Sequence, residues 1–194
     1  MTGGLTWHMG EVARSERTAA AGGEGCTVWL TGLSGSGKST IAHRCEGLLV
    51  AAGRMAYTLD GDNIRYGLNR DLGFSADDRH ENVRRVGEVA RLMADSGLAV
   101  FAPLISPYAA DRDRVRSIHL AAQIPFHEVH VATPLEVCEE RDNKGLYARA
   151  RAGEILDFTG ISAPYEEPMA PDLRIDAGAV SLDEAVSAVM ALLP

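Results

Sequence analysis

The feature of this sequence that most constrains its fold is a glycine-rich segment at residues 32–39, which reads GLSGSGKS. Its spacing matches G-x-x-x-x-G-K-[ST], the pattern of a phosphate-binding loop, or P-loop. In such a loop, backbone N–H groups bind the phosphates of a nucleoside triphosphate. The lysine reaches the terminal phosphates, and the serine hydroxyl ligates Mg²⁺. We therefore predict a nucleoside triphosphate site in which Lys38 and Ser39 take these two roles.

The flanking residues have the pattern that a P-loop requires. Residues 26–30 form a short apolar run that is typical of a buried strand. Residues 40–50 read as a helix, because Ile41, Cys45 and Leu49 recur at helical spacing. Strand, loop and helix in this order distinguish a P-loop from a glycine-rich turn that happens to carry a surface lysine.

The use of lysine in this chain supports the same interpretation. There are seventeen arginines but only two lysines, Lys38 and Lys144. A P-loop needs the compact charge of an ammonium group, which the wider guanidinium fork of arginine does not replace. This requirement accounts for Lys38 and, more weakly, marks Lys144 as a second candidate functional residue.

Composition and charge bound the class of protein. The 194 residues suit one globular domain, and 46% hydrophobic with 24% charged residues is ordinary for a soluble protein. A net charge of −8 argues against a broad nucleic-acid-binding surface. No stretch approaches the ~20 apolar residues that span a membrane, and no signal pattern opens the chain. We expect neither nucleic acid nor membrane as a partner.

Cysteine usage favours a cytoplasmic location. Cys26, Cys45 and Cys138 are odd in number, lie far apart and form no C-x-x-C pair. This spacing argues against a disulfide framework and against a zinc site. Buried or unpaired thiols of this kind are typical of a reducing compartment.

Strand-like and helix-like segments alternate along the chain. Ser75 with Asp78 predicts the start of a helix that ends near Ser96, and Ser181 with Glu184 predicts the start of the last helix. The pairs Ser106-Pro107 and Thr133-Pro134 each read as a helix N-cap followed by proline. Further strands are predicted at residues 55–60, 98–102, 126–131 and 173–175. This alternation predicts an α/β fold with a mostly parallel five-stranded sheet and helices on both faces.

Two segments stand outside this alternation. Residues 1–24 are predicted to be an N-terminal extension of the P-loop domain at 25–194, with Trp7 and His8 as candidate anchors. Residues 142–171 are rich in glycine, proline, arginine and acidic residues. A long irregular stretch inside a compact domain is usually a functional loop, so we interpret this one as a lid, although a solvated excursion has the same composition.

Polar residues after the second predicted strand extend the site. Asp60 and Asp62 follow that strand, and ligands of an open parallel sheet bind beyond the carboxyl ends of its strands. These carboxylates could bind Mg²⁺ or orient an attacking hydroxyl. A plain Asp-Gly turn would have the same sequence. Five arginines follow, with an aromatic ring and an amide among them: Arg65, Arg70, Phe74, Arg79, Asn82, Arg84 and Arg85. Guanidinium groups suit phosphate or sulfate oxygens, although an ordinary charged helix face has the same composition.

Several other functions lack the residues they need. A GTPase would need Asn-Lys-x-Asp, but residues 143–146 read NKGL. A dinucleotide site would need G-x-G-x-x-G, and Thr40 occupies its last position. His127 and His130 lie three apart on a predicted strand and so face opposite sides, which favours surface or hydrogen-bonded histidines over metal ligands. The residues themselves indicate a P-loop phosphotransferase with a small anionic acceptor, and they do not name the acceptor.

Ordered motifs over nearly the whole chain carry a resemblance to a known family. Besides the P-loop, they read TWH at 6–8, LDGDNIR at 59–65, NRDLGFS at 69–75, ENVRRVGE at 81–88, LISPY at 104–108, DRD at 111–113, KGLY at 144–147, RARAGEI at 149–155 and FTGI at 158–161. In these motifs the sequence resembles the adenylyl-sulfate kinases. The resemblance implies transfer of the γ-phosphoryl group of ATP to the 3′-hydroxyl of adenylyl sulfate in sulfate assimilation, with Mg²⁺ as the cofactor.

The resemblance also implies residue roles. Residues of the P-loop bind the ATP phosphates, namely Gly32, Leu33, Ser34, Gly35, Ser36, Gly37, Lys38, Ser39 and Thr40. Arg141 lies along the ATP adenine, Asp60 lies near the metal and the attacking hydroxyl, and Lys144 belongs to the lid. Adenylyl sulfate is held by Asp62, Arg65, Phe74, Arg79, Asn82, Ile105, Leu146 and Phe158, with the two phenylalanines on either side of its adenine. The resemblance further implies a homodimer and is compatible with an ATP sulfurylase partner.

The resemblance and the residues themselves indicate different roles for Ser106, and two lid residues depart from the family pattern. Descriptions of the family mark the serine at this position as a phosphoserine intermediate, whereas the residues alone read equally as a helix N-cap, and direct in-line transfer needs no covalent step. Asn143 and Ala148 depart from the residues that the family pattern leads us to expect, and both lie in the lid.

Two alternatives remain open from the sequence. One is a P-loop kinase for another small hydroxylated acceptor, which would not need the set Asp62, Arg65, Phe74, Arg79 and Asn82. The other is a nucleotide sensor without catalysis, against which the intact Lys38, Ser39 and Asp60 argue.

Overall fold

A parallel sheet of five strands forms the centre of the molecule. The computed structural model describes residues 6, 8, 10–142 and 144–194. The strands are β1 (Cys26–Thr31), β2 (Ala56–Thr58), β3 (Ala99–Pro103), β4 (Phe126–Val131) and β5 (Leu173–Ile175). They run in the order β2-β3-β1-β4-β5, and every pair is parallel. The predicted parallel five-stranded sheet is confirmed, with β2 shorter than the residues 55–60 that the sequence indicated.

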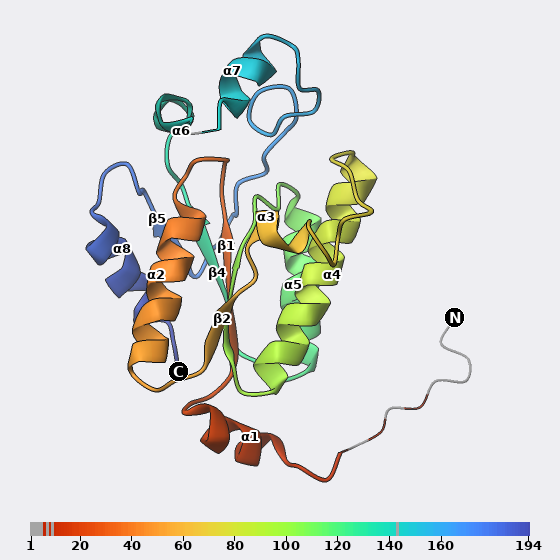
Figure 1. Cartoon of the computed structure of the whole chain (residues 1–194), viewed down its shortest axis with the longest axis vertical. Coiled ribbons are helices and arrows are strands. Elements are labelled where there is room, and N and C mark those ends of the chain that lie inside the picture. Colours follow the sequence, from red (N-terminus) through yellow and green to blue (C-terminus); the bar gives the residue numbers. More distant parts are fainter. Residues whose placement is uncertain (1–5, 7, 9, 143) are drawn as a thin grey trace.

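Helices cover both faces of this sheet (Figure 1). One face carries α2 (Lys38–Ala51) and α8 (Leu182–Met190), and the other carries α4 (Ala76–Asp95) and α5 (Ala109–Ala121). Short helices α3 (Gly61–Ile64), α6 (Leu135–Arg141) and α7 (Leu146–Arg151) lie toward the carboxyl ends of the strands. Among the helices of the described residues, none has both the length and the apolar character needed to cross a bilayer.

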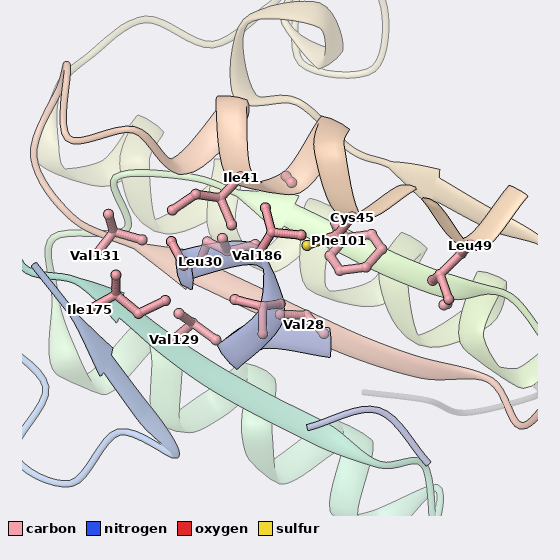
Figure 2. Packing of buried hydrophobic residues seen from close by; sticks show 14 of the residues in the cluster. Val28, Leu30, Ile41, Cys45, Leu49, Phe101, Val129, Val131, Ile175 and Val186 are labelled. Carbon is pink, nitrogen blue, oxygen red and sulfur yellow. The ribbon is translucent and has the colours of Figure 1, made fainter. Parts of the chain in front are cut away.

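Strand β1 joins the two hydrophobic cores. All six of its residues are buried, because strands lie on both sides of it and helices on both faces. Val28 and Leu30 point to the core under α2 and α8, which Figure 2 shows, and Trp29 points to the core under α4 and α5. The strand that leads into the P-loop is therefore held from both sides and from both faces of the sheet.

Two of the four predicted helix N-caps are present in the structure. Ser75 accepts a hydrogen bond from the backbone of Asp78 at the start of α4. Ser181 and Glu184 form a reciprocal capping box at the start of α8. Gly97 adopts φ +103° directly after α4, a backbone angle that favours glycine.

The two Ser/Thr-Pro predictions are wrong. Helix α5 begins only at Ala109, three residues after Ser106, and the hydroxyl of Ser106 instead accepts a hydrogen bond from Trp29. Helix α6 begins at Leu135, and the Thr133 hydroxyl donates to the backbone carbonyl of Ser36 in the P-loop. In both cases the hydroxyl makes a tertiary hydrogen bond, and the residue directly before the helix is Tyr108 or Pro134, neither of which caps it with a side chain.

The N-terminal extension contains a helix that the sequence analysis did not predict. Helix α1 (Arg14–Ala21) lies at the amino-terminal end of the sheet, away from the P-loop (Figure 1). Arg14 and Arg17 both form ion pairs with Asp95 at the end of α4, at 2.7 and 2.8 Å. Of the two candidate anchors, His8 is exposed and Trp7 lies outside the described residues.

Candidate active site

One cleft of about 830 Å³ opens beyond the carboxyl ends of β1 and β3. The P-loop, α3, the start of α4, the loop after β3 and the segment 142–159 form its walls. The cleft gathers most residues that the sequence analysis proposed: Ser34, Gly35, Gly37, Lys38, Ser39, Thr40, Asp60, Asp62, Arg65, Phe74, Arg79, Asn82, Ile105, Ser106, Lys144, Leu146 and Phe158. Segments more than a hundred residues apart in the sequence therefore meet at one edge of the sheet.

Glycines give the P-loop its shape. Gly32 has φ +151°, and a Cβ there would lie 2.4 Å from the backbone oxygen of Val131. Gly37, with φ +106°, is the residue directly before α2. The loop therefore ends on the N-terminus of a fourteen-residue helix, where free N–H groups and the helix dipole favour phosphate.

The ammonium group of Lys38 is hydrogen-bonded to the P-loop itself. Its Nζ donates to the backbone oxygens of Gly32 (3.0 Å) and Leu33 (2.6 Å) and to the Ser36 hydroxyl (3.3 Å). The side chain is buried, and burial lowers the pKa of its ammonium to about 8. An ammonium bonded only to neutral oxygens in this position is ready to exchange them for phosphate oxygens.

Ser39 and Asp60 meet at the base of the cleft. The Ser39 hydroxyl donates to Oδ2 of Asp60 at 2.7 Å, and Oδ1 of Asp60 accepts the backbone N–H of Asp62 at 2.9 Å. A hydroxyl and a carboxylate side by side form a donor set that suits Mg²⁺. The described residues contain no group of three or more His, Cys, Asp or Glu side chains placed for a metal.

His43 also lies at this position and was not selected from the sequence. Its Nε2 is 3.8 Å from Oδ2 of Asp60, and its Nδ1 is 3.5 Å from Glu46. The only sequence signal was its spacing, because residue 43 lies one helical turn after Ser39 on α2.

A basic and aromatic wall faces the P-loop across the cleft. The guanidinium of Arg65 lies 4.4 Å from the centre of the Phe74 ring. Burial, together with the nearby charge of Arg79, lowers the pKa of Arg65. Arg79 donates to the backbone oxygen of Phe74 at 2.8 Å, and also to Thr159 and to the backbone of Asp157. Arg79 therefore connects α4 to the segment after α7.

Not all of the clustered arginines belong to the cleft. Arg84 and Arg85 pair with Glu81 on the same helix, and Arg85 also pairs with Asp71. Arg70 is exposed and does not line the cleft. For these three residues the interpretation as an ordinary charged surface is confirmed.

The predicted lid segment 142–171 contributes residues between 142 and 159 to the wall of the cleft, and it contains the short helix α7. The carboxylate of Asp142 accepts three backbone N–H groups at the start of α7, from Leu146, Tyr147 and Ala148, at 2.8, 3.0 and 3.1 Å. Lys144 forms an ion pair with Asp62 across the mouth of the cleft. Asn143 lies outside the described residues.

Tyr147 joins this lid to the P-loop. Its hydroxyl donates to the backbone oxygen of Ser34 at 2.8 Å, and its ring packs edge-on against Phe158 with centroids 5.0 Å apart. Sequence analysis did not select Tyr147, because a buried tyrosine has no distinctive spacing. Phe158 and the largely exposed Phe74 both line the cleft from opposite elements, the lid and the segment before α4.

Two predicted residues have surroundings that differ from the expectation. Ser106 is buried, has φ +40° and accepts a hydrogen bond from the indole N–H of Trp29 at 3.1 Å. Arg141 does not line the main cleft, and it contributes to a second hollow of about 390 Å³ on the other side of Gly35 and Gly37. Its guanidinium donates to the backbone oxygen of Ala177 at 2.7 Å.

The two strand histidines have surroundings that the sequence did not predict. His130 packs against Tyr165, with ring centroids 5.9 Å apart. Contrary to the expectation that they are surface or hydrogen-bonded residues, Nε2 of His127 and Nδ1 of His130 are buried and lack a partner among the described residues.

Comparison with known proteins identifies the family. A family profile described as "Adenylylsulphate kinase" matches residues 24–176, which is well over half of the chain. This chain belongs to the adenylyl-sulfate kinase family. It is 55% identical to the adenylyl-sulfate kinase of Shewanella amazonensis over 94% of this chain and 91% of that one. It is 52% identical to the adenylyl-sulfate kinase of Saccharomyces cerevisiae over 97% and 93% of the two chains.

A solved structure of the family has the same fold. The Mycobacterium tuberculosis APS kinase CysC, in complex with AMPPNP and APS, superposes with a TM-score of 0.85 at 55% identity. The match covers 87% of this chain and 97% of that one. The protein is thus a P-loop kinase of the adenylyl-sulfate kinase family, as the motifs in its sequence indicated.

Proposed function

We propose that this protein transfers the γ-phosphoryl group of ATP to the 3′-hydroxyl of adenylyl sulfate, giving 3′-phosphoadenylyl sulfate and ADP in sulfate assimilation. The observation that carries the proposal is that one cleft holds the P-loop on one wall and the set Arg65, Phe74, Arg79 and Asn82 on the other. The P-loop suits a triphosphate, and the facing wall offers guanidinium groups and an aromatic ring to an anionic nucleotide.

The P-loop side binds ATP. The N–H groups at residues 32–40 and the ammonium of Lys38 hold the phosphates, and the second hollow, beside Arg141 and Ala177, takes the adenine. Since Lys38 is already bonded to loop oxygens, binding replaces neutral acceptors by anionic ones. Charge-assisted hydrogen bonds of this kind are about twice as strong as neutral ones.

Mg²⁺ is the cofactor of the proposed reaction, and Ser39 with Asp60 would hold it. Their oxygens are 2.7 Å apart at the foot of the cleft, and hydroxyl and carboxylate oxygens are the donors that a hard cation prefers. When bound, Mg²⁺ neutralises charge on the β- and γ-phosphates of ATP.

Asp60 also orients the acceptor. Its two oxygens accept the N–H of Asp62 and the hydroxyl of Ser39, which fixes the carboxylate, and the residue lines the cleft. A carboxylate in this place accepts the hydrogen of the attacking 3′-hydroxyl and aligns its oxygen with the γ-phosphorus. Phosphoryl transfer depends mostly on such positioning and on charge stabilisation.

The opposite wall and the lid hold adenylyl sulfate. Arg65 and Arg79 face its phosphate and sulfate oxygens, while Phe74 and Phe158 stack on its adenine from two sides. Asn82, which accepts a hydrogen bond from Asn69 at 3.0 Å, presents its amide to the same nucleotide. Remaining contacts come from Asp62, Ile105, Leu146 and, at the lid, Lys144.

Transfer is direct, without a phosphoserine. The hydroxyl of Ser106 is bonded to Trp29, and a left-handed backbone holds the residue at the back of the cleft. The hydroxyl therefore has a structural partner that accounts for it without a covalent step. Ser106 contributes to the site as part of the wall that contacts the acceptor.

The experiment that tests the function is ADP release from Mg-ATP with and without adenylyl sulfate, followed by chromatography of the product. Release that depends on adenylyl sulfate, with 3′-phosphoadenylyl sulfate appearing, supports the proposal. ATP binding without that turnover contradicts it, and a panel of other hydroxyl acceptors then separates a kinase for another acceptor from a nucleotide sensor.

Assembly and location complete the proposal. We expect a homodimer, which light scattering would test. Co-purification from the source cells would test whether ATP sulfurylase is a partner. A cytoplasmic location agrees with the need for ATP and with three buried free thiols, Cys26, Cys45 and Cys138.

A further inference from the structure

The DRD motif at residues 111–113 has no role in the chemistry described above, yet its arginine is among the most buried charges of the chain. Arg112 lies on α5 and is 2% exposed. Its guanidinium donates three hydrogen bonds, each 2.7 Å long: Nε to Oε1 of Glu128, Nη1 to the backbone oxygen of Ser106, and Nη2 to the backbone oxygen of Glu166. These acceptors belong to β4, to the loop after β3 and to the segment that leads from the lid to β5.

The first of the two carbonyl partners lies in a wall of the cleft. Residues 104–107 line the cleft directly. Ser106, in the middle, has φ +40°, a conformation that a residue other than glycine keeps only when its surroundings hold it. Trp29 holds its hydroxyl, Thr31 donates to the preceding carbonyl of Ile105 at 2.7 Å, and Arg112 holds its own carbonyl.

The second carbonyl partner anchors the end of the lid on the same loop. Glu166 donates its backbone N–H to Pro107 at 2.8 Å, and its carboxylate accepts the N–H of Ala109 at 2.7 Å. The hydroxyl of the neighbouring Tyr165 lies 3.0 Å from that of Thr31. The lid residues 155–159, which line the cleft, are followed within a few residues by this attachment.

The chemistry of arginine explains why this residue type lies at the junction. A guanidinium is planar, stays charged and directs its donors along several fixed directions, so one side chain can bridge three acceptors from three elements. Glu128, 7% exposed, supplies the compensating charge. A lysine could keep the pairing with Glu128 but could not hold both carbonyls in the same directions.

We infer that Arg112 is a positioning residue for the acceptor nucleotide: it fixes the wall 104–107 and the end of the lid relative to each other. This inference rests on the proposed function. Arg112 makes no hydrogen bond or ion pair with the P-loop among the described residues. Its effect should therefore fall on adenylyl sulfate and leave ATP binding nearly unchanged, whereas a buried ion pair that only stabilises the fold would show no such selectivity.

The chain offers a matched control on the same helix. Arg116 lies one turn after Arg112 and also approaches Glu128, at 3.5 Å, while pairing with Asp172 at 2.7 Å. It contacts neither Ser106 nor Glu166 through any hydrogen bond of the described residues. Arg116→Met thus removes a cation of the same cluster without touching the wall or the lid.

The test is steady-state kinetics for both substrates, with thermal unfolding of each variant. We expect Arg112→Met to raise KM for adenylyl sulfate at least tenfold while KM for ATP stays within twofold of wild type. Arg112→Lys should recover much of the melting temperature but not the KM for adenylyl sulfate. Arg116→Met should leave both KM values unchanged.

Other outcomes overturn the inference. If both KM values rise alike, or if Arg112→Lys recovers both KM and melting temperature, Arg112 is only a structural cation. If Arg112→Met fails to fold, the pair Arg112→Met with Glu128→Leu removes both charges, and an unchanged KM for adenylyl sulfate in that folded variant overturns the inference as well. Failure of the proposed function is separate, because wild type itself would then not turn over adenylyl sulfate.

Discussion

The hydroxyl of Ser39 donates a hydrogen bond to the carboxylate of Asp60 across 2.7 Å, although the two residues follow strands that are not neighbours in the sheet. Ser39 lies in the first turn of α2, which follows β1, Asp60 follows β2, and β3 lies between these strands. The pair therefore closes the cleft above the carboxyl end of β3, at the place where an open parallel sheet binds its ligands.

Replacement of Asp60 tests this pair. Asp60→Asn keeps the size of the side chain and an oxygen that can accept from Ser39, but it removes the negative charge. We expect kcat to fall by about 10²- to 10⁴-fold, the range for loss of a positioned acid or base group. ATP affinity measured without Mg²⁺ should change little, because the P-loop residues are intact.

The control for this prediction is Asp113→Asn on α5, where the carboxylate is exposed and away from the cleft. Both variants lose one negative charge, so a fall in kcat confined to Asp60→Asn points to the site. An Asp60→Asn enzyme with more than a third of wild-type kcat would contradict the assigned role.

Replacement of Ser106 tests direct transfer. Ser106→Ala removes the only hydroxyl that a phosphoserine route could use at this position and leaves the indole N–H of Trp29 without its acceptor. We expect kcat to stay within about tenfold of wild type and the free energy of unfolding to fall by roughly 1–3 kcal/mol, the cost of an unsatisfied buried donor. Turnover and urea unfolding measure the two effects.

Ser106→Gly is the companion variant. Glycine adopts φ +40° without strain, so this change should lose less stability than Ser106→Ala while removing the same hydroxyl. Loss of activity by a thousandfold or more in both variants, with folding intact, would restore the covalent route.

The sequence was sufficient to predict the parts of the fold that local patterns determine. The P-loop, the buried strand before it and the helix N-caps at Ser75 and Ser181 all depend on residues within a few positions of one another. The family motifs also predicted that Asp60, Phe74 and Lys144 share one site, and the structure places all three in one cleft.

What the sequence could not predict depends on contacts between distant residues. The predicted caps at Ser106 and Thr133 are wrong, since α5 and α6 begin after Tyr108 and Pro134, and the two hydroxyls bond to Trp29 and Ser36, 77 and 97 positions away. Helix α1 is held by Asp95, far along the chain, rather than by a strong pattern of its own. The same reason kept Tyr147 out of the predicted site, since its partner is a backbone oxygen of the P-loop.

The pKa of Lys38 predicts a proton uptake on ATP binding. Burial lowers this pKa to about 8 in the free protein, so part of the population is neutral at pH 8.5. Triphosphate favours the ammonium form, and binding at this pH should therefore take up a fraction of a proton, which vanishes near pH 6.5 to 7 where Lys38 is already charged. Calorimetry in two buffers of different ionisation enthalpy measures the uptake.

The lowered pKa of Lys38 also makes the stability of the free protein depend on pH. The folded-state pKa lies below the ordinary value of 10.5, so the cost of burying the ammonium is fully present below pH 8 and is relieved between pH 8 and 10.5. The contribution of Lys38 to the stability of the free protein should therefore rise with pH over this window. Lys38→Met should abolish both the proton uptake and this contribution, and an uptake that survives the substitution would assign it to another group.

The ion pair between Lys144 and Asp62 predicts how the lid behaves. Both side chains are more than half exposed, so the pair itself adds little stability, about 0–1 kcal/mol at most. The ion pair matters because of its position: it connects the lid to α3 across the mouth of the cleft, and both residues line the cleft. We expect Lys144→Met to leave thermal stability unchanged, to reduce kcat by about 10- to 100-fold and to speed amide exchange across residues 144–159.

Arg151 is the control that distinguishes the position of Lys144 in the cleft from the mere presence of a positive charge in the lid. It is another exposed lid cation, paired with Glu139 at 2.6 Å, and it does not line the cleft. Arg151→Met should leave kcat within twofold of wild type and change exchange only near its own helix. Since both substitutions remove one exposed positive charge from the lid, equal effects of the two on kcat would mean that the lid responds to net charge, and the specific role of Lys144 would be rejected.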